Sequence, residues 1–498
     1  MQSASGTLRT GSRQCEGNAL TRRVRVCSRS RPAATARPSS SSSSSRRRGR
    51  PVCAAATAEH KTEAPGLSLM KWLKDNGAPQ DKVELRTLEV QAAGRPLDVT
   101  VAAQPLAAGD VALSVPEKLV VTLDRIFESE GLAEMLTAGK LSELACLALY
   151  MMYEKKVGKE GFWHQYIKEL DRQRARGVQA VESPLLWSDE ELTDLLQGSP
   201  VVAAVRARLA GIEKEYNELD GVWFMAGSLF NKYPFDIPTE AFPFVRFKQA
   251  FAAVQASIVH LQGVALARRF ALVPLGPPLL SYSSTAKATF KYNPENKCVE
   301  LVVDRDYQPG EPLYAWCGPQ PNSRLLLNYG IVDESNPYDK LPLVVTLPAN
   351  DPLYKVKRGI LQEENLSTLQ TFDMKRGQPL PPLLLPYLRL AFATTHEQLD
   401  KVVFSEGAAA FDPQLEQIAA CHLAAHLNER MAGYKHPLWR DLEILEDPEA
   451  SPRQKVAARL TKIEKSILQG CLDAVGTCAP CLDAANSPKT SLAVKFSG

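Results

Sequence analysis

An ordered series of apolar runs at residues 268–337 constrains the fold of this chain more than any other feature. Apolar side chains occur at the alternate positions 299, 301 and 303, a pattern typical of a strand with one buried face. A Pro309-Gly310 turn follows, and residues 312–318 form a second strand-like run, so we expect the two runs to pair as a hairpin. The series ends on an apolar run that leads into Tyr329-Gly330. This order predicts a β-rich core built around residue 300.

The rest of the chain divides into a strand-forming start, a helical middle and a helical end. Apolar residues alternate through residues 97–101 and again through residues 111–115, which predicts a strand, loop, strand unit and an opening hairpin. Residues 120–260 are mostly helical in pattern, with Ser188 and Glu191 spaced as a capping box. A strand is expected at 341–347. Helical patterns follow at 383–403, 414–432 and 452–475. The fold class is therefore α+β.

Charge is distributed unevenly along the 498 residues. Residues 1–58 hold 12 arginines, no lysine and one acidic residue, Glu16, for a net charge of +11. The whole chain carries +3, so residues 59–498 carry −8. A body with that charge does not bind nucleic acid through a general basic surface, and direct nucleic-acid binding is not expected.

The composition of residues 1–58 is typical of an organelle transit peptide, because it is rich in arginine and serine and almost free of acids. Seven consecutive serines, 39–45, precede Arg46-Arg47-Arg48, and Val52-Cys53-Ala54 resembles the cleavage signal of algal plastid precursors. We expect a protein of the chloroplast stroma. The alternative is a disordered basic arm that stays on the protein.

No apolar run predicts a membrane span, and no motif predicts a metal site. The ten cysteines are scattered, so most are expected to be small buried side chains. Cys478 and Cys481 have metal-ligand spacing without a second pair. His422 and His426 lie four residues apart, but Leu423 stands where a zinc protease motif requires glutamate, so we interpret them as ordinary surface or core histidines.

Residues 268–337 resemble the SET domain of protein lysine methyltransferases, in the subgroup similar to the Rubisco large-subunit methyltransferase. Ser281-Tyr282-Ser283 follows a Val-Pro run, at the place of the family's Asn-His-Ser segment, and Tyr329-Gly330 follows an apolar run. The resemblance implies that Tyr329 is the late catalytic tyrosine. Cys317 takes the place of the earlier tyrosine. The resemblance implies Ser281, Tyr282 and Cys317 as the positions that bind S-adenosylmethionine. At the family's Gly-x-Gly the chain has Leu97-Asp98-Val99, whose side chains are expected to crowd that cofactor.

The same resemblance implies a domain order. We expect a transit peptide at 1–58, a SET domain at 65–340 with its helical insert at about 120–260, a helical substrate-binding-like domain at 341–476, and a disordered tail at 477–498.

Longer runs narrow the resemblance to the SET-domain proteins of the plastid transcriptionally active chromosome. They are residues 215–220, 222–230, 233–242, 265–280 and 316–322. This likeness implies a nucleoid-associated accessory or scaffold subunit of the plastid-encoded RNA polymerase, needed for plastid transcription and chloroplast development, with the polymerase and its associated proteins as partners. The alternative is an S-adenosylmethionine-dependent protein-lysine N-methyltransferase acting on a plastid protein.

Overall fold

The computed structural model of the chain describes residues 66–90, 95–127, 141–174, 183–227, 243–378, 380–405, 407, 409–478 and 494–497. The expected plastid leader lies outside this part of the chain, as do residues 479–493 of the expected tail. Buried apolar side chains from Leu69 to Val494 form one connected core. None of the described helices is both long and apolar enough to cross a membrane.

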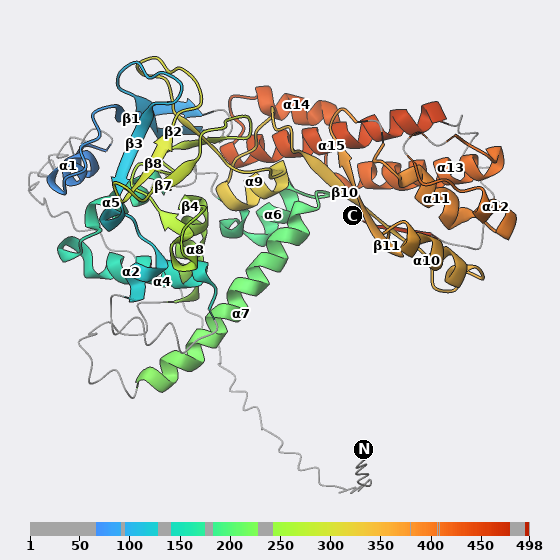
Figure 1. Cartoon of the computed structure of the whole chain (residues 1–498), viewed down its shortest axis with the longest axis horizontal. Helices are drawn as coiled ribbons and strands as arrows, with labels where there is room; N and C mark the ends of the chain where they lie inside the picture. Colours follow the sequence, from blue (N-terminus) through green and yellow to red (C-terminus); the bar gives the residue numbers. More distant parts are fainter. Residues whose placement is uncertain are drawn as a thin grey trace, which may run out of the picture. The chain divides into compact units, whose positions relative to one another are not determined.

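The N-terminal half contains a short helix and several small sheets (Figure 1). Helix α1 (Leu67–Asp75) is followed by an antiparallel hairpin of β1 (Val83–Val90) and β2 (Arg95–Ala102). A three-stranded antiparallel sheet has the order β3 (Val111–Pro116), β8 (Cys298–Val302), β7 (Phe290–Asn293). Two further pairs are β4 (Ile258–His260) with β5 (Phe270–Leu272), and β6 (Ser281–Ser283) with β9 (Tyr314–Trp316). The β6–β9 pair is parallel.

Strands lie at each of the places where apolar alternation predicts one, but two predicted pairings are wrong. Strand β2 pairs with β1 and not with β3, and β8 pairs with β3 and β7 while β9 pairs with β6. The segment between β8 and β9 instead forms backbone hydrogen bonds with β2 and the residues after β2. Gly310 N donates to Ala102 O at 2.7 Å, and Leu313 N donates to Thr100 O at 3.0 Å. These bonds satisfy backbone groups that the predicted hairpin would have paired locally.

The expected helical insert is present. It consists of α2 (Leu123–Phe127), α4 (Glu143–Val157), α5 (His164–Arg174), α6 (Asp189–Leu195), α7 (Val201–Gly227) and α8 (Phe244–Ser257). Ser188 and Glu191 form the predicted capping box at the start of α6. Trp163 and Trp187 are buried in the core, and the Trp163 indole donates to the Tyr150 hydroxyl at 2.9 Å.

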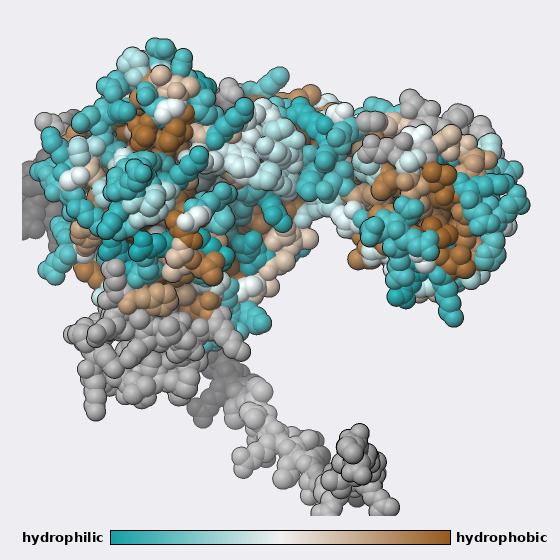
Figure 2. All heavy atoms as spheres, viewed as in Figure 1, coloured by the Kyte–Doolittle hydropathy of each residue, from teal (hydrophilic) through white to brown (hydrophobic). Residues whose placement is uncertain are grey.

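The C-terminal half is mostly helical around a small sheet of the order β11 (Leu369–Lys375), β10 (Lys340–Thr346), β12 (Lys495–Ser497). Its helices are α10 (Tyr354–Glu363), α11 (Leu384–Phe392), α12 (His396–Asp400), α13 (Pro413–Gly433), α14 (Leu438–Glu446) and α15 (Pro452–Cys478). Figure 2 shows an apolar area on this half, around the position of α11 and β11 in Figure 1, on a face that is otherwise largely hydrophilic.

The expected disorder from residue 477 is wrong at the end of the chain. Residues 495–497 add the third strand to the sheet by pairing with β10. Val494 is buried, and the Phe496 ring stacks on the His426 ring with centroids 5.1 Å apart. The sequence did not predict this strand, because the three residues of β12 are too few to be recognised by alternation.

Polar contacts join the helical insert to α15. Ser199, between α6 and α7, donates through Oγ to Glu464 Oε1 at 2.9 Å. Arg453 reaches Glu191 at 2.7 Å, and its guanidinium lies over the Trp187 ring at 5.5 Å from the centroid. The two halves therefore share ion pairs as well as apolar core.

Candidate functional site

The parallel pair β6–β9 places two of the predicted site segments side by side. Ser281, Tyr282 and Ser283 of β6 face Tyr314, Ala315 and Trp316 of β9 in register. Cys317 follows β9 directly and is buried, with 6% of its surface exposed.

Tyr329 reaches the same place from a helix. It is the last residue of α9 (Asn322–Tyr329), and Gly330 ends that helix in the left-handed conformation at φ 72°. Glycine adopts this conformation without steric cost, which explains the Tyr-Gly pair in the sequence. The Tyr282 and Tyr329 rings lie 4.7 Å apart between centroids, at an interplanar angle of 47°. The structure thus brings Tyr282, Cys317 and Tyr329 together, and Ser281 lies on the strand beside them.

Burial keeps the acidic groups of this site protonated. It raises the pKa of Tyr282 well above 10, with smaller contributions from Tyr329 and Cys317, and it raises the pKa of Tyr329 as well. Burial also raises the pKa of the Cys317 thiol to about 11. At neutral pH the site therefore offers neutral hydroxyls, a neutral thiol and aromatic rings. The Cys317 thiol is therefore not a thiolate nucleophile at this pH.

Gln320 is a site residue that the sequence analysis did not single out. Its Nε2 donates to the Cys317 carbonyl and lies 3.5 Å from the Tyr329 hydroxyl oxygen. Its Oε1 accepts from Asn328 Nδ2 at 3.0 Å, and its own carbonyl accepts from Asn336 Nδ2 at 2.8 Å. Gln320 therefore connects the Cys317 backbone to the Tyr329 hydroxyl. The only signal for it was its place in the run 316–322.

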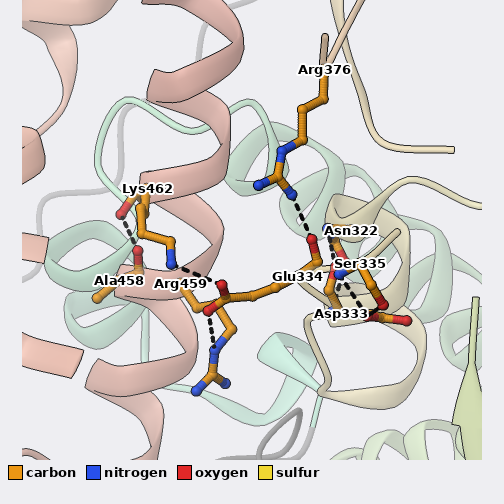
Figure 3. A network of polar contacts seen from close by, with 9 residues as sticks. Asn322, Asp333, Glu334, Ser335, Arg376, Ala458, Arg459 and Lys462 are labelled. Atoms are coloured by element: carbon orange, nitrogen blue, oxygen red, sulfur yellow. Dashed lines mark hydrogen bonds and ion pairs between the residues drawn. The ribbon is translucent and has the colours of Figure 1, made fainter. Parts of the chain in front are cut away.

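The loop after Tyr329 is held by a polar network (Figure 3). Asp333 and Asn322 exchange hydrogen bonds: Asp333 N donates to Asn322 Oδ1 at 2.8 Å, and Asn322 Nδ2 donates to Asp333 O at 2.9 Å. The Glu334 carboxylate contacts Arg459 and Lys462 of α15. Burial alone would raise the pKa of Glu334, but the hydrogen bond and charge of Lys462 and the charge of Arg459 hold this pKa below its usual range.

At the positions predicted to match the family's Gly-x-Gly, Asp98 is a fully buried residue that forms an ion pair. Its Oδ2 lies 3.0 Å from Arg172 Nη2, and its Oδ1 accepts from Thr87 Oγ1 at 2.6 Å. Arg172 lies in α5, and this contact links α5 to β2.

The side chains present suit a sulfonium cofactor in part. Two aromatic rings attract a cation through their π faces, and hydroxyl and carbonyl oxygens favour a polarised methyl group. Ser281, Tyr282 and Ser283 are each only partly buried, so β6 is accessible to a ligand. Ser281 and Tyr282, with Cys317 beside them, would hold S-adenosylmethionine. Leu97 and Asp98 differ from the glycines expected for close backbone approach.

No cluster of three His, Cys, Asp or Glu side chains suited to a metal occurs in the described part of the chain. His422 and His426 each stack on an aromatic ring, Phe392 and Phe496 respectively. The Cys478 and Cys481 side chains lie outside the described residues.

Comparison with known proteins places this geometry in a known fold. Residues 348–468 match the family described as Rubisco LSMT substrate-binding. A solved structure of Rubisco LSMT bound to AdoMet aligns with a TM-score of 0.64 and 21% identity, covering 83% of this chain and 92% of that one. The SET domain of LSMT bound to MeLysine and AdoHcy aligns with a TM-score of 0.65, 21% identity and the same coverage. The chain has the SET-domain methyltransferase fold.

Curated relatives of this SET-fold chain are protein methyltransferases. The actin-histidine N-methyltransferase of Xenopus tropicalis is 25% identical over 423 residues, which cover 81% of this chain and 68% of that protein. The mouse actin-histidine N-methyltransferase is 24% identical over 435 residues, with coverage of 83% and 69%. The α+β fold class and the helical C-terminal domain expected from the sequence are confirmed.

Proposed function

We propose that this SET-fold chain is an S-adenosylmethionine-dependent protein N-methyltransferase. The observation that carries the proposal is the packing of Tyr282 on Tyr329 beside buried Cys317, with the Tyr329 hydroxyl near Gln320. Similarity to protein methyltransferases over more than four fifths of the chain supports it. So does the likeness to solved structures that contain AdoMet or AdoHcy.

Methyl transfer requires the protein mainly to position the two reacting groups and to exclude water from them. S-adenosylmethionine supplies the electrophilic methyl group, and the acceptor nitrogen must be neutral and in line with it. A buried channel lowers the pKa of a lysine or histidine acceptor and so favours its neutral form. Tyr329, held near Gln320, orients that nitrogen through its hydroxyl oxygen, while the Tyr282 ring excludes water.

The C-terminal half would hold the protein substrate. Its family match is to a substrate-binding domain, and it carries the apolar area seen in Figure 2. Exposed apolar surface of this kind is typical of protein docking sites. The arginine-rich residues 1–58 lead us to place the acceptor among proteins of the chloroplast stroma.

The first test is calorimetric titration of S-adenosylmethionine into the full chain, followed by radiolabelled methyl transfer to stromal protein. We expect binding in the micromolar range and a labelled protein. Tyr329→Phe is expected to keep binding and lose transfer by on the order of 100-fold, because the acceptor is misplaced. Tyr338→Phe is the matched control, since Tyr338 is 38% exposed and packs near Trp316. Absence of both binding and label would overturn the proposal.

A second candidate function is the scaffold subunit of the plastid-encoded RNA polymerase. Two substitutions in the candidate site favour this function. The Asp98 carboxylate forms an ion pair with Arg172, and Cys317 takes the place of a tyrosine. In that case the chain lacks transfer activity but co-purifies with polymerase subunits at moderate salt. Failure to co-purify would remove this candidate. A steep loss of DNA affinity with added salt would instead indicate direct DNA binding.

A further inference from the structure

Glu334 lies five residues after Tyr329 and reaches the C-terminal helix α15. Its Oε1 lies 3.2 Å from Arg459 Nε, and its Oε2 lies 2.9 Å from Lys462 Nζ. Its main-chain carbonyl accepts from Arg376 Nη1 at 2.5 Å. Figure 3 shows all three cations converging on this one residue. The two α15 side chains are largely buried, with 14% and 20% of their surface exposed, so their charges are partly shielded from water.

The residue before it, Asp333, contacts the cofactor strand. Asp333 Oδ2 accepts from Ser284 N at 3.1 Å and from Ser284 Oγ at 2.5 Å. Ser284 follows β6 directly and is 2% exposed. The Asn322 amide, at the start of the helix that carries Tyr329, pairs with the Asp333 backbone. Asp333 and Glu334 therefore connect β6, α9 and α15 within two residues.

The loop itself has no regular structure that could hold it in place. Residues 331–336 form neither a helix nor a strand, and Gly330 before them is in the left-handed conformation. Side-chain contacts from three elements therefore fix its position, and Glu334 supplies those to α15. Removing its charge frees one side of the loop while Asp333 still holds the other.

We propose that Glu334 is a positioning residue that transmits the placement of α15 to β6 and Tyr329. Its consequence for catalysis rests on the proposed function: protein substrate that docks on the C-terminal domain adjusts the cofactor strand through Glu334. Coupling of this kind requires that the two sites bias one shared element, which here is the loop 331–336.

Hydrogen exchange measured by mass spectrometry on the full chain tests this without requiring activity. In Glu334→Gln we expect exchange to rise severalfold in peptides from residues 277–290 and 318–336, and to stay unchanged in β10 and β11. Glu443→Gln is the matched control, because Glu443 forms an exposed ion pair with Arg440 within α14. A general rise across the chain would mean a merely structural role, and no rise at 277–290 would overturn the proposal.

A double-mutant cycle tests the contact between Glu334 and α15 by changing the α15 residues. The double variant Arg459→Met/Lys462→Met is expected to reproduce the local rise, and adding Glu334→Gln to it is expected to add little, because both changes break one interaction. Fully additive effects would contradict the proposal.

Cofactor titration provides the second readout. Glu334→Gln is expected to weaken S-adenosylmethionine binding about fivefold, within the usual range of coupling between sites. If the unaltered chain binds no cofactor, the proposed function fails while the exchange result still decides the role of Glu334.

Discussion

At the residue scale, Cys317 is a buried thiol beside Tyr282 and Tyr329. Because burial raises its pKa to about 11, less than a thousandth of it is thiolate at pH 7.5, and we expect it to resist alkylation. Cys298 and Cys421 are partly exposed and serve as internal controls. Peptide mapping after iodoacetamide treatment of the native chain is expected to find both controls modified and Cys317 intact. Rapid modification of Cys317 would indicate an accessible, activated thiol.

The ion pair of Asp98 with Arg172 makes a second prediction at this scale. Arg172→Gln removes the ion pair between Arg172 and the Asp98 carboxylate, whose side chain is 0% exposed. We expect a loss of about 3 kcal/mol in the free energy of unfolding, as for a broken buried pair. Arg206→Gln breaks an exposed pair with Asp189 and is expected to cost less than about 1 kcal/mol. Urea denaturation compares the two, and equal losses would contradict the assignment.

Some of the site residues could be identified from the sequence and others could not. Tyr282, Cys317 and Tyr329 could be found because each lies beside a recognisable run. Gln320 could not, because a single amide has no pattern of its own. The partner of Asp98 could not be predicted either, since Arg172 lies 74 residues away on another element. Long-range polar pairs of this kind follow from tertiary packing.

At the element scale, apolar alternation predicted the strands better than their partners. Alternation states which side chains face the core, and it located β2, β3, β8 and β10 correctly. Pairing depends also on the connections. The segment between β8 and β9 bonds to residues 100–106, so the Pro309-Gly310 turn does not close a hairpin between these strands. The parallel β6–β9 pair could not be predicted, because each strand has three residues.

A substitution in strand β12 measures how much the end of the chain contributes to the stability of the fold. Phe496→Ala removes the ring that stacks on His426, and we expect a loss of about 2 kcal/mol in the free energy of unfolding, below the range for a fully buried ring. Leu369→Ala, in the same sheet, is the control, because Leu369 is 60% exposed and its truncation is expected to change stability by less than about 0.5 kcal/mol. Equal effects would mean that β12 adds little.

At the scale of the whole molecule, the change in pattern near residue 340 predicts a domain boundary, but the contacts across it could not be predicted. Glu464 shows why: it lies on the apolar stripe of α15 with Leu460, Ile463 and Ile467, where the sequence predicts only core packing. The structure places its carboxyl between Ser199 of the helical insert and the Tyr434 hydroxyl, which donates to Oε2 at 3.0 Å. A buried carboxyl therefore lies between the two halves.

The pKa of Glu464 makes that contact sensitive to pH. Burial raises this pKa to about 8, despite hydrogen bonds from Ser199 and Tyr434 that favour the ionised form. Between an ordinary carboxyl pKa and 8, the folded chain holds a proton that the unfolded chain releases. The free energy of unfolding therefore falls as pH rises through this window, by at most about 1.4 kcal/mol per pH unit, and levels off above it.

Glu464→Gln removes the titrating carboxyl and with it this pH dependence. Urea denaturation at pH 5, 6.5 and 8 is expected to show the unaltered chain losing stability relative to this variant, whereas Glu443→Gln is expected to follow the unaltered chain. Parallel curves for the unaltered chain and Glu464→Gln would mean that Glu464 is ionised in the folded protein, with the two halves held by a charged contact at neutral pH.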